Sequence, residues 1–186
     1  MPGRLYNFDN PDRFVAGALG PAGSRTFYLQ SRESGRLVSV LLEKVQVTLL
    51  AERLRELLTE VRLRGAGVPE DVSADAIDRA PLEQPIDEVF RVGTLAIVWD
   101  GDDETILVEA REMTDQDDDA DEPVDPEETM DDDADVLRVH LQPAQALAFA
   151  ASALEVVAAG RPPCPFCGQP LNPEGHICAR RNGFMH

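Results

Sequence analysis

Residues 39–46 read SVLLEKVQ, and in this stretch a strand pattern runs directly into a helix pattern. Val and Leu dominate the first half, and from Leu50 to Val61 the apolar residues recur at helical spacing. Gly65 follows as a helix cap. Three apolar runs with β-type composition, separated by Gly-containing turns, come before the helix, at residues 14–19, 26–31 and 36–43. This part of the chain therefore predicts three strands followed by one helix.

The same transition returns 99 positions later, where residues 138–145 read RVHLQPAQ. Val40, Leu42 and Gln46 match Val139, Leu141 and Gln145 in phase. Proline at position 143 suits the first turn of a helix, where its missing N–H has no partner to lose. Three further strand patterns precede this second helix, at residues 90–99, 105–113 and 136–141.

The repeated order predicts an α+β domain over residues 1–160. We expect two βββα units related by pseudo-two-fold symmetry, 1–65 and 89–160, which share an antiparallel sheet or two abutting sheets. Both helices would cover one face. Residues 66–88, rich in Pro and acids, are expected to form a linker with one short helical turn. The alternative is an α+β domain without internal symmetry.

The 186-residue chain carries a net charge of −18, most of which is local. Residues 115–135 contain 13 acids and no Lys or Arg, and the net charge without them is −5. The few apolar residues in this run cannot bury enough surface to offset the entropy that ordering would cost. We therefore expect a disordered acidic loop. It either engages a basic patch on a partner or only keeps the protein soluble. A surface this acidic disfavours nucleic-acid binding.

The C-terminal segment 161–186 has the ligand pattern of a zinc knuckle. Cys164 and Cys167 form a Cys-x-x-Cys turn followed by Gly, and His176 and Cys178 lie two residues apart, so both can point to the same side of an extended segment. Four Cys₃His ligands complete a tetrahedron and leave no open position, which is the structural type of zinc site. The few apolar residues here predict that the metal supplies the folding energy.

Other interpretations of this segment stay open. The Cys-x-x-Cys pair is also the motif of redox proteins, or the thiols are simply free. His186 is a competing ligand, and the basic flank Arg180–Arg181 suits a phosphate or an acidic surface, including the chain's own acidic loop.

The remaining sequence indicates a cytoplasmic protein without a catalytic set. We find no signal-peptide pattern and no membrane-length apolar run, and three clustered Cys beside a His are typical of a reducing compartment. No nucleophile motif, phosphate loop or His-centred constellation occurs. An enzyme is thus disfavoured, and the oligomeric state is left open.

Several short motifs resemble an actinobacterial signature family of largely uncharacterised, ParJ-like proteins. They are FRVG (90–93), WD (99–100), CPFCG (164–168) and GHICARRNG (175–183), and the region around Asp9 and Phe14 also fits. Ala179 stands where the family pattern has Pro, which leaves the ligands intact. The resemblance implies a non-enzymatic partner of a ParA-type ATPase that restrains its polymerisation in chromosome segregation.

Two other classes of function remain as alternatives. One is an enzyme, or an accessory subunit of one, with a structural zinc module. The other is a nucleic-acid-binding zinc protein, for which affinity would fall steeply with salt.

Overall fold

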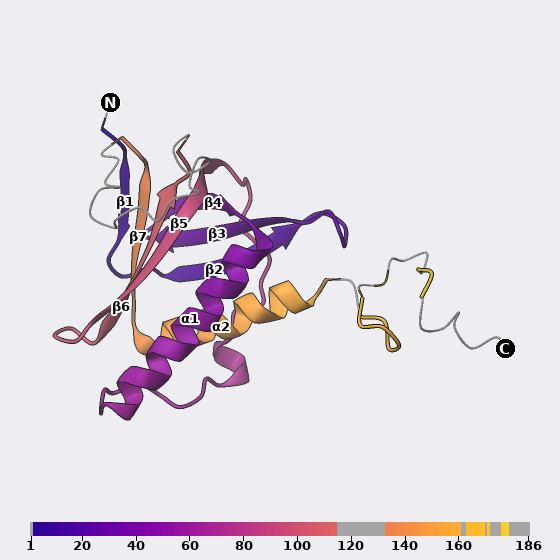
Figure 1. Ribbon diagram of the computed structural model, residues 1–186. Coiled ribbons are helices and arrows are strands. Elements are labelled where there is room, and N and C mark those ends of the chain that lie inside the picture. Colours follow the sequence, from indigo (N-terminus) through magenta and orange to yellow (C-terminus); the bar gives the residue numbers. More distant parts are fainter. Residues whose placement is uncertain (1, 115–132, 161–162, 170, 172–175, 179–186) are drawn as a thin grey trace, which may run out of the picture.

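The computed structural model describes residues 2–114, 133–160, 163–169, 171 and 176–178. It is an α+β fold in which a seven-stranded sheet is covered by two helices (Figure 1). The strands are β1 (Leu5–Phe8), β2 (Arg13–Leu19), β3 (Thr26–Glu33), β4 (Arg36–Leu42), β5 (Glu88–Asp100), β6 (Thr105–Glu112) and β7 (Val136–Leu141). The helices are α1 (Lys44–Leu63) and α2 (Pro143–Ala158).

The sheet is mixed, which corrects the expectation of an antiparallel sheet. Its order is β1-β7-β6-β5-β4-β3-β2. The pairs β2–β3, β3–β4, β5–β6 and β6–β7 are antiparallel, whereas β1 pairs with β7, and β4 with β5, in parallel. Parallel pairing needs a long connection, which α1 and residues 64–87 supply between β4 and β5.

Strand β1 was not expected from the sequence. It is only four residues long, and residues 9–12 separate it from β2. Because β1 and β2 form the two ends of the strand order, one short stretch of chain spans the whole sheet and the sheet must curve strongly. Two hydrogen bonds hold the start of β1 beside the start of β7. Val136 N donates to Arg4 O at 2.8 Å, and Arg4 N donates to the Asp135 carboxylate at 2.7 Å.

Helix α2 begins at Pro143, as the sequence predicted, and α1 begins at Lys44, before the Leu50–Val61 pattern that predicted it. Both helices begin in the same way. The backbone N–H of Glu43 donates to Gln46 Oε1 at 2.8 Å, and that of Gln142 donates to Gln145 Oε1 at 3.1 Å. Each glutamine thereby satisfies a backbone donor at its helix start. At the other end of α1, Gly65 takes φ 98°, the left-handed conformation that ends helices with glycine.

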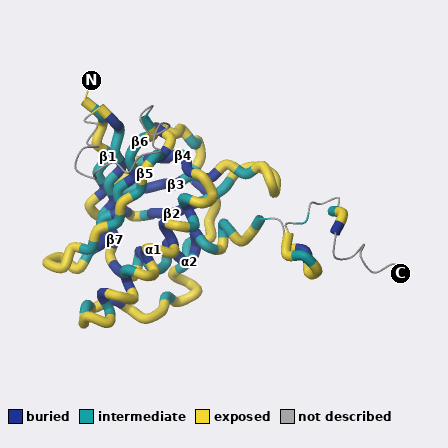
Figure 2. The backbone as a smooth tube through the Cα atoms, viewed as in Figure 1, coloured by how far each residue is buried: buried dark blue, intermediate teal, exposed yellow. Residues whose placement is uncertain are grey.

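The core lies between the helices and the concave face of the sheet, where buried residues gather (Figure 2). Aliphatic side chains make up most of it, together with five phenylalanines. Leu29, Val40 and Val139 come from the strands, and Leu54 and Ala150 come from α1 and α2. The two helices also contact one another, so neither buries its apolar side against the sheet alone.

Residues 66–88, here called the connector, lie against the body. The single 3₁₀ turn, Ala74–Ala76, matches the expected short helical turn. Arg13 on β2 binds the Asp78 carboxylate at 2.6 and 3.1 Å and donates to the carbonyls of Ala80 and Pro81. Ser152 Oγ on α2 donates to the Asp78 carbonyl at 2.6 Å. The connector thus bridges β2 and α2.

Most of the acidic run, residues 115–132, lies outside the described residues, and with it the expectation of disorder. The described residues on either side of this stretch are hydrogen-bonded to each other. Glu112 N donates to Asp135 O at 2.8 Å, and Asp135 N donates to Glu112 Oε2 at 3.1 Å. Among the helices described, none is both long enough and apolar enough to cross a membrane.

A candidate metal centre in the C-terminal tail

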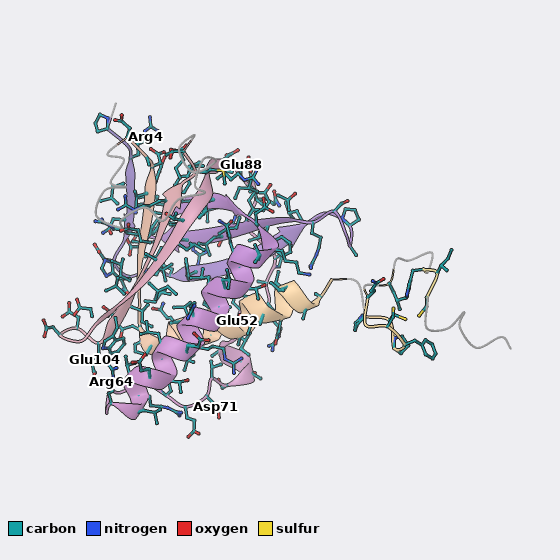
Figure 3. All side chains as sticks on the ribbon, viewed as in Figure 1. Arg4, Glu52, Arg64, Asp71, Glu88 and Glu104 are labelled. Atoms are coloured by element: carbon teal, nitrogen blue, oxygen red, sulfur yellow. The ribbon has the colours of Figure 1, made fainter. Side chains whose placement is uncertain are left out.

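The candidate metal centre lies in the tail that follows α2. In Figure 3 the tail extends beyond the end of α2, and its sulfur atoms stand out in yellow. Residues 165–167 form a tight turn, in which Gly168 N donates to Cys164 O at 2.8 Å and Cys164 N donates to Gln169 O at 2.7 Å. Gly168 has φ 74°, which a side chain would strain. This turn brings Cys167 back beside Cys164.

The structure brings all four predicted ligands together. Their ligand atoms lie within 4.8 Å of one another. Cys164 Sγ is 4.0 Å from Cys178 Sγ, and Cys167 Sγ is 3.2 Å from His176 Nε2. Sulfur atoms on a zinc tetrahedron with bonds of about 2.3 Å would be about 3.8 Å apart. The four ligands are therefore already spaced for a single tetrahedral ion.

Burial also separates the ligands from their neighbours. Cys164 and Cys178 are each 5% exposed, whereas Ile177 between His176 and Cys178 is 88% exposed. In an extended segment successive residues point to opposite sides, so turning both ligands inward forces Ile177 outward. In this segment the Cys and His side chains are turned inward and the apolar Ile177 is exposed, which is the reverse of an apolar core.

His176 presents Nε2 to the thiols and buries its other ring nitrogen. Within the described residues, Nδ1 has no hydrogen-bond partner. A buried, unpaired polar atom costs free energy, and in metal sites the second ring nitrogen normally holds the imidazole in place. The bond from an ion to Nε2 would have to outweigh this cost.

The thiols differ in their readiness to ionise. Burial opposes ionisation of Cys164, but hydrogen bonds from the backbone N–H groups of Cys167 and Phe166 and from the other thiols outweigh it, so its pKa is lowered. At Cys167 a backbone hydrogen bond from Gln169 favours the thiolate, yet burial and the neighbouring thiols prevail and raise the pKa. One thiolate therefore forms first and its charge hinders the next, until a cation joins them.

This donor set could bind a metal ion. Three thiolates and an imidazole suit a borderline or soft ion and exclude Ca²⁺ and Mg²⁺, which need oxygen ligands. The competing ligand His186 and the basic pair Arg180–Arg181 lie outside the described residues. His140 is on β7, where Nε2 is 3.8 Å from Asp9 Oδ1, and it belongs to the sheet.

The family described as "Protein of unknown function (DUF3090)" matches residues 6–178. The chain belongs to this family. The match spans the sheet, both helices and all four ligands, and it confirms the resemblance to an uncharacterised family. No curated protein and no solved structure matches the chain.

A second concavity in this DUF3090 chain lies between α2, β2 and the connector, with a volume of about 390 Å³. Its polar side chains are engaged with one another. Arg79 binds Glu155 through two contacts of 2.8 Å, and Arg25 donates to the carbonyls of Val156 and Val157 at the end of α2. These groups hold the connector and cap the helix. They are a structural network and not a convergent catalytic set.

Sequence reasoning found every ligand of the metal cluster but missed the polar residues that fasten the connector. Arg13 is the first residue of β2, and Gln30 and Ser39 are buried polar positions within β3 and β4. An interrupted apolar pattern is the signal that could have marked them, since buried polar groups need partners.

Proposed function

We propose that this chain is a non-enzymatic regulatory protein that acts by binding a partner protein, and that a structural zinc ion folds its tail. The closed Cys₃His set carries the zinc assignment. With four protein ligands on one tetrahedral ion, no position remains for a water or a substrate. Elemental analysis of the purified chain should find about one zinc per chain. A different metal at that stoichiometry would refute zinc.

The partner that we propose is a ParA-type ATPase in a chromosome-segregation system, and the compartment is the cytoplasm. The resemblance to ParJ-like proteins supports this partner, and the net charge of −18 is complementary to a basic, DNA-binding surface. The three thiols suit a reducing compartment. The acidic run 115–135 would compete with DNA, or with a neighbouring ATPase subunit, for the basic face.

Sedimentation of the host's ParA-type ATPase with ATP tests this proposal. The wild-type chain should reduce the pelleted ATPase, and a variant with the acids of residues 115–132 changed to Ser or Asn should lose the effect. A variant with the same residues in shuffled order is the matched control. It keeps the charge and changes only the order of the residues, so it should still reduce the pelleted ATPase. Unchanged inhibition by the neutralised variant would refute the loop mechanism, and no effect of the wild-type chain would refute this partner.

We also propose that the body consists of two βββα halves related by pseudo-two-fold symmetry. The two helix-start hydrogen bonds support it, since Glu43–Gln46 and Gln142–Gln145 are 99 positions apart. The ladders support it as well. Leu29 pairs with Val40 in one half and Val108 with Val139 in the other, and Val40 and Val139 are again 99 apart.

The next ladder continues this correspondence. Leu29 also pairs with Ala16 on β2, and Val108 also pairs with Ile97 on β5, so the middle strand of each half has matching neighbours on both sides. An experimental structure tests the symmetry. Superposing residues 13–63 on 88–158 should need a rotation close to 180°, and a rotation far from that value would refute it.

A further inference from the structure

We infer that the groove between α1 and β5 is the docking site for an extended segment of the partner protein, one that carries a basic residue flanked by apolar residues. This inference rests on the proposed role as an interaction protein. The groove encloses about 320 Å³. Among the described residues its lining comes from α1 and β5 alone, namely Arg53, Glu56, Leu57, Glu60, Leu95 and Ile97.

A counterpart of this groove exists on the other side of the body, between α2 and β2. Three residues of α2 line it, Ser152, Glu155 and Val156, together with Ala159 directly after the helix. Each stands 99 positions after one of the four α1 residues that line the α1–β5 groove. The two grooves are therefore lined by corresponding residues of the two halves.

The chain's own connector lies across the counterpart groove and forms one of its walls. Arg79 binds Glu155, and the carbonyl of Asp78 accepts from Ser152 Oγ. Leu82 packs against β2 at Gly17, so closely that a Cβ added there would lie 2.5 Å from Leu82 Cγ. A backbone carbonyl, a basic side chain and an apolar side chain of one segment thus contact α2 and β2 at this type of groove.

Among the described residues, the α1–β5 groove has the features of the same site without such a segment. The ladder between β4 and β5 ends at Arg91, so from Thr94 to Asp100 β5 pairs only with β6 and leaves one edge open. Val45 and Leu49 of α1 are 60% and 50% exposed, at positions where α2 carries Ala144 and Ala148. An open strand edge is a template for an added segment, and the two exposed residues add apolar surface on the helix that lines the groove.

Charge specifies what the segment carries. Arg53 replaces Ser152 and Glu56 takes the place of Glu155, and the two pair with each other at 3.0 Å on a largely exposed surface. Glu56 is therefore placed to receive a basic residue as Glu155 receives Arg79. Arg53 would donate to the backbone carbonyl just before that basic residue, as Ser152 donates to the Asp78 carbonyl in the connector.

A labelled synthetic peptide with the sequence of residues 74–84, ADAIDRAPLEQ, is the probe. Titration with the full-length chain, followed by fluorescence anisotropy, should show saturable binding. Glu56→Arg should weaken it about fivefold, and the peptide change Arg79→Glu should restore binding to that variant. The matched control is Glu52→Arg, which changes the net charge equally on the same helix but outside the groove (Glu52 is labelled in Figure 3). It should leave binding unchanged.

Hydrogen exchange locates the bound peptide, and protection should appear at residues 94–100. Absence of saturable binding, equal weakening by Glu52→Arg, or protection at β2 in place of β5 would each overturn the inference. A concentration-dependent dimer that Glu56→Arg dissociates would also overturn it, in favour of a second copy of this chain. The peptide assay contains no ATPase, so its failure and a failure of the sedimentation experiment are separate results.

Discussion

Gln30 on β3 and Glu83 in the connector bind each other through two reciprocal hydrogen bonds. Gln30 Nε2 donates to Glu83 O at 3.0 Å, and Glu83 N donates to Gln30 Oε1 at 2.9 Å. The Gln30 amide thereby acts as a strand partner for one peptide unit of the connector. Gln30 Nε2 also donates to Ser39 Oγ at 3.0 Å, and Gln30 is 1% exposed. This contact holds the connector to the outer face of the sheet.

Replacing Gln30 with Met should destabilise the protein by about 2–3 kcal/mol. Met fills the space but leaves the Glu83 N–H without its acceptor, and unpaired buried groups are costly. Urea denaturation measures the change. Gln169→Met, at an exposed residue of the tail, is the control and should stay within about 0.5 kcal/mol of wild type. Equal effects of both changes would show that the Gln30–Glu83 contact contributes little.

Gly17→Ala should cost about 1–3 kcal/mol, because the new Cβ would lie 2.5 Å from Leu82 Cγ. Leu82→Ala removes the clash, so the double variant should lose less than the sum of the single changes, by about 1 kcal/mol. A double-mutant cycle in urea measures this coupling. Additive effects would mean that Leu82 does not pack on Gly17.

The ion pair of Asp78 with Arg13 should stabilise the protein at neutral pH and lose this effect in acid. The hydrogen bond from Arg13 is the main cause that lowers the pKa of Asp78, against the opposing effect of burial. A lowered folded-state pKa contributes stability above the ordinary carboxyl pKa of about 3.9, and this is lost as pH falls through the folded value. Asp78→Asn should therefore destabilise the protein clearly at pH 7, and the difference from wild type should shrink toward pH 3.

Thermal unfolding of wild type and variant at several pH values measures this difference. Asp71→Asn is the matched control, since Asp71 lies exposed in the same connector (labelled in Figure 3), and it should change stability little at any pH. A constant difference between wild type and Asp78→Asn across pH would contradict the ion-pair explanation.

Cys164→Ser or Cys178→Ser should abolish metal binding and unfold the tail. Each removes one of four ligands from a segment whose apolar residues cannot hold it folded. The melting temperature of the body should stay within about 2 °C of wild type. Metal analysis, limited proteolysis and calorimetry measure these effects. Ile177→Ser, at the exposed residue between two ligands, should keep the metal. Loss of the entire fold in a Cys variant would mean that tail and body are one folding unit.

The sequence alone determined the elements that depend on local pattern. Six strands and both helices follow from periodicity and turn residues. The four residues of the candidate metal centre follow from residue type and spacing, because a Cys-x-x-Cys turn and a His-x-Cys pair each direct their donor atoms by local geometry. Only the tertiary structure decided how these parts combine. Strand β1 is four residues long and exists because β7 offers it an edge.

The connector illustrates the same limit. Its prolines and acids give no periodic signal, and it is ordered by partners far away in the chain, Arg13, Gln30 and Ser152. Parallel pairing of β1 with β7 and of β4 with β5 likewise depends on contacts between distant segments. The local sequence pattern determines which secondary structure a segment can form. Its position in the fold depends on contacts of buried polar groups with distant residues, and these contacts form only in the folded chain.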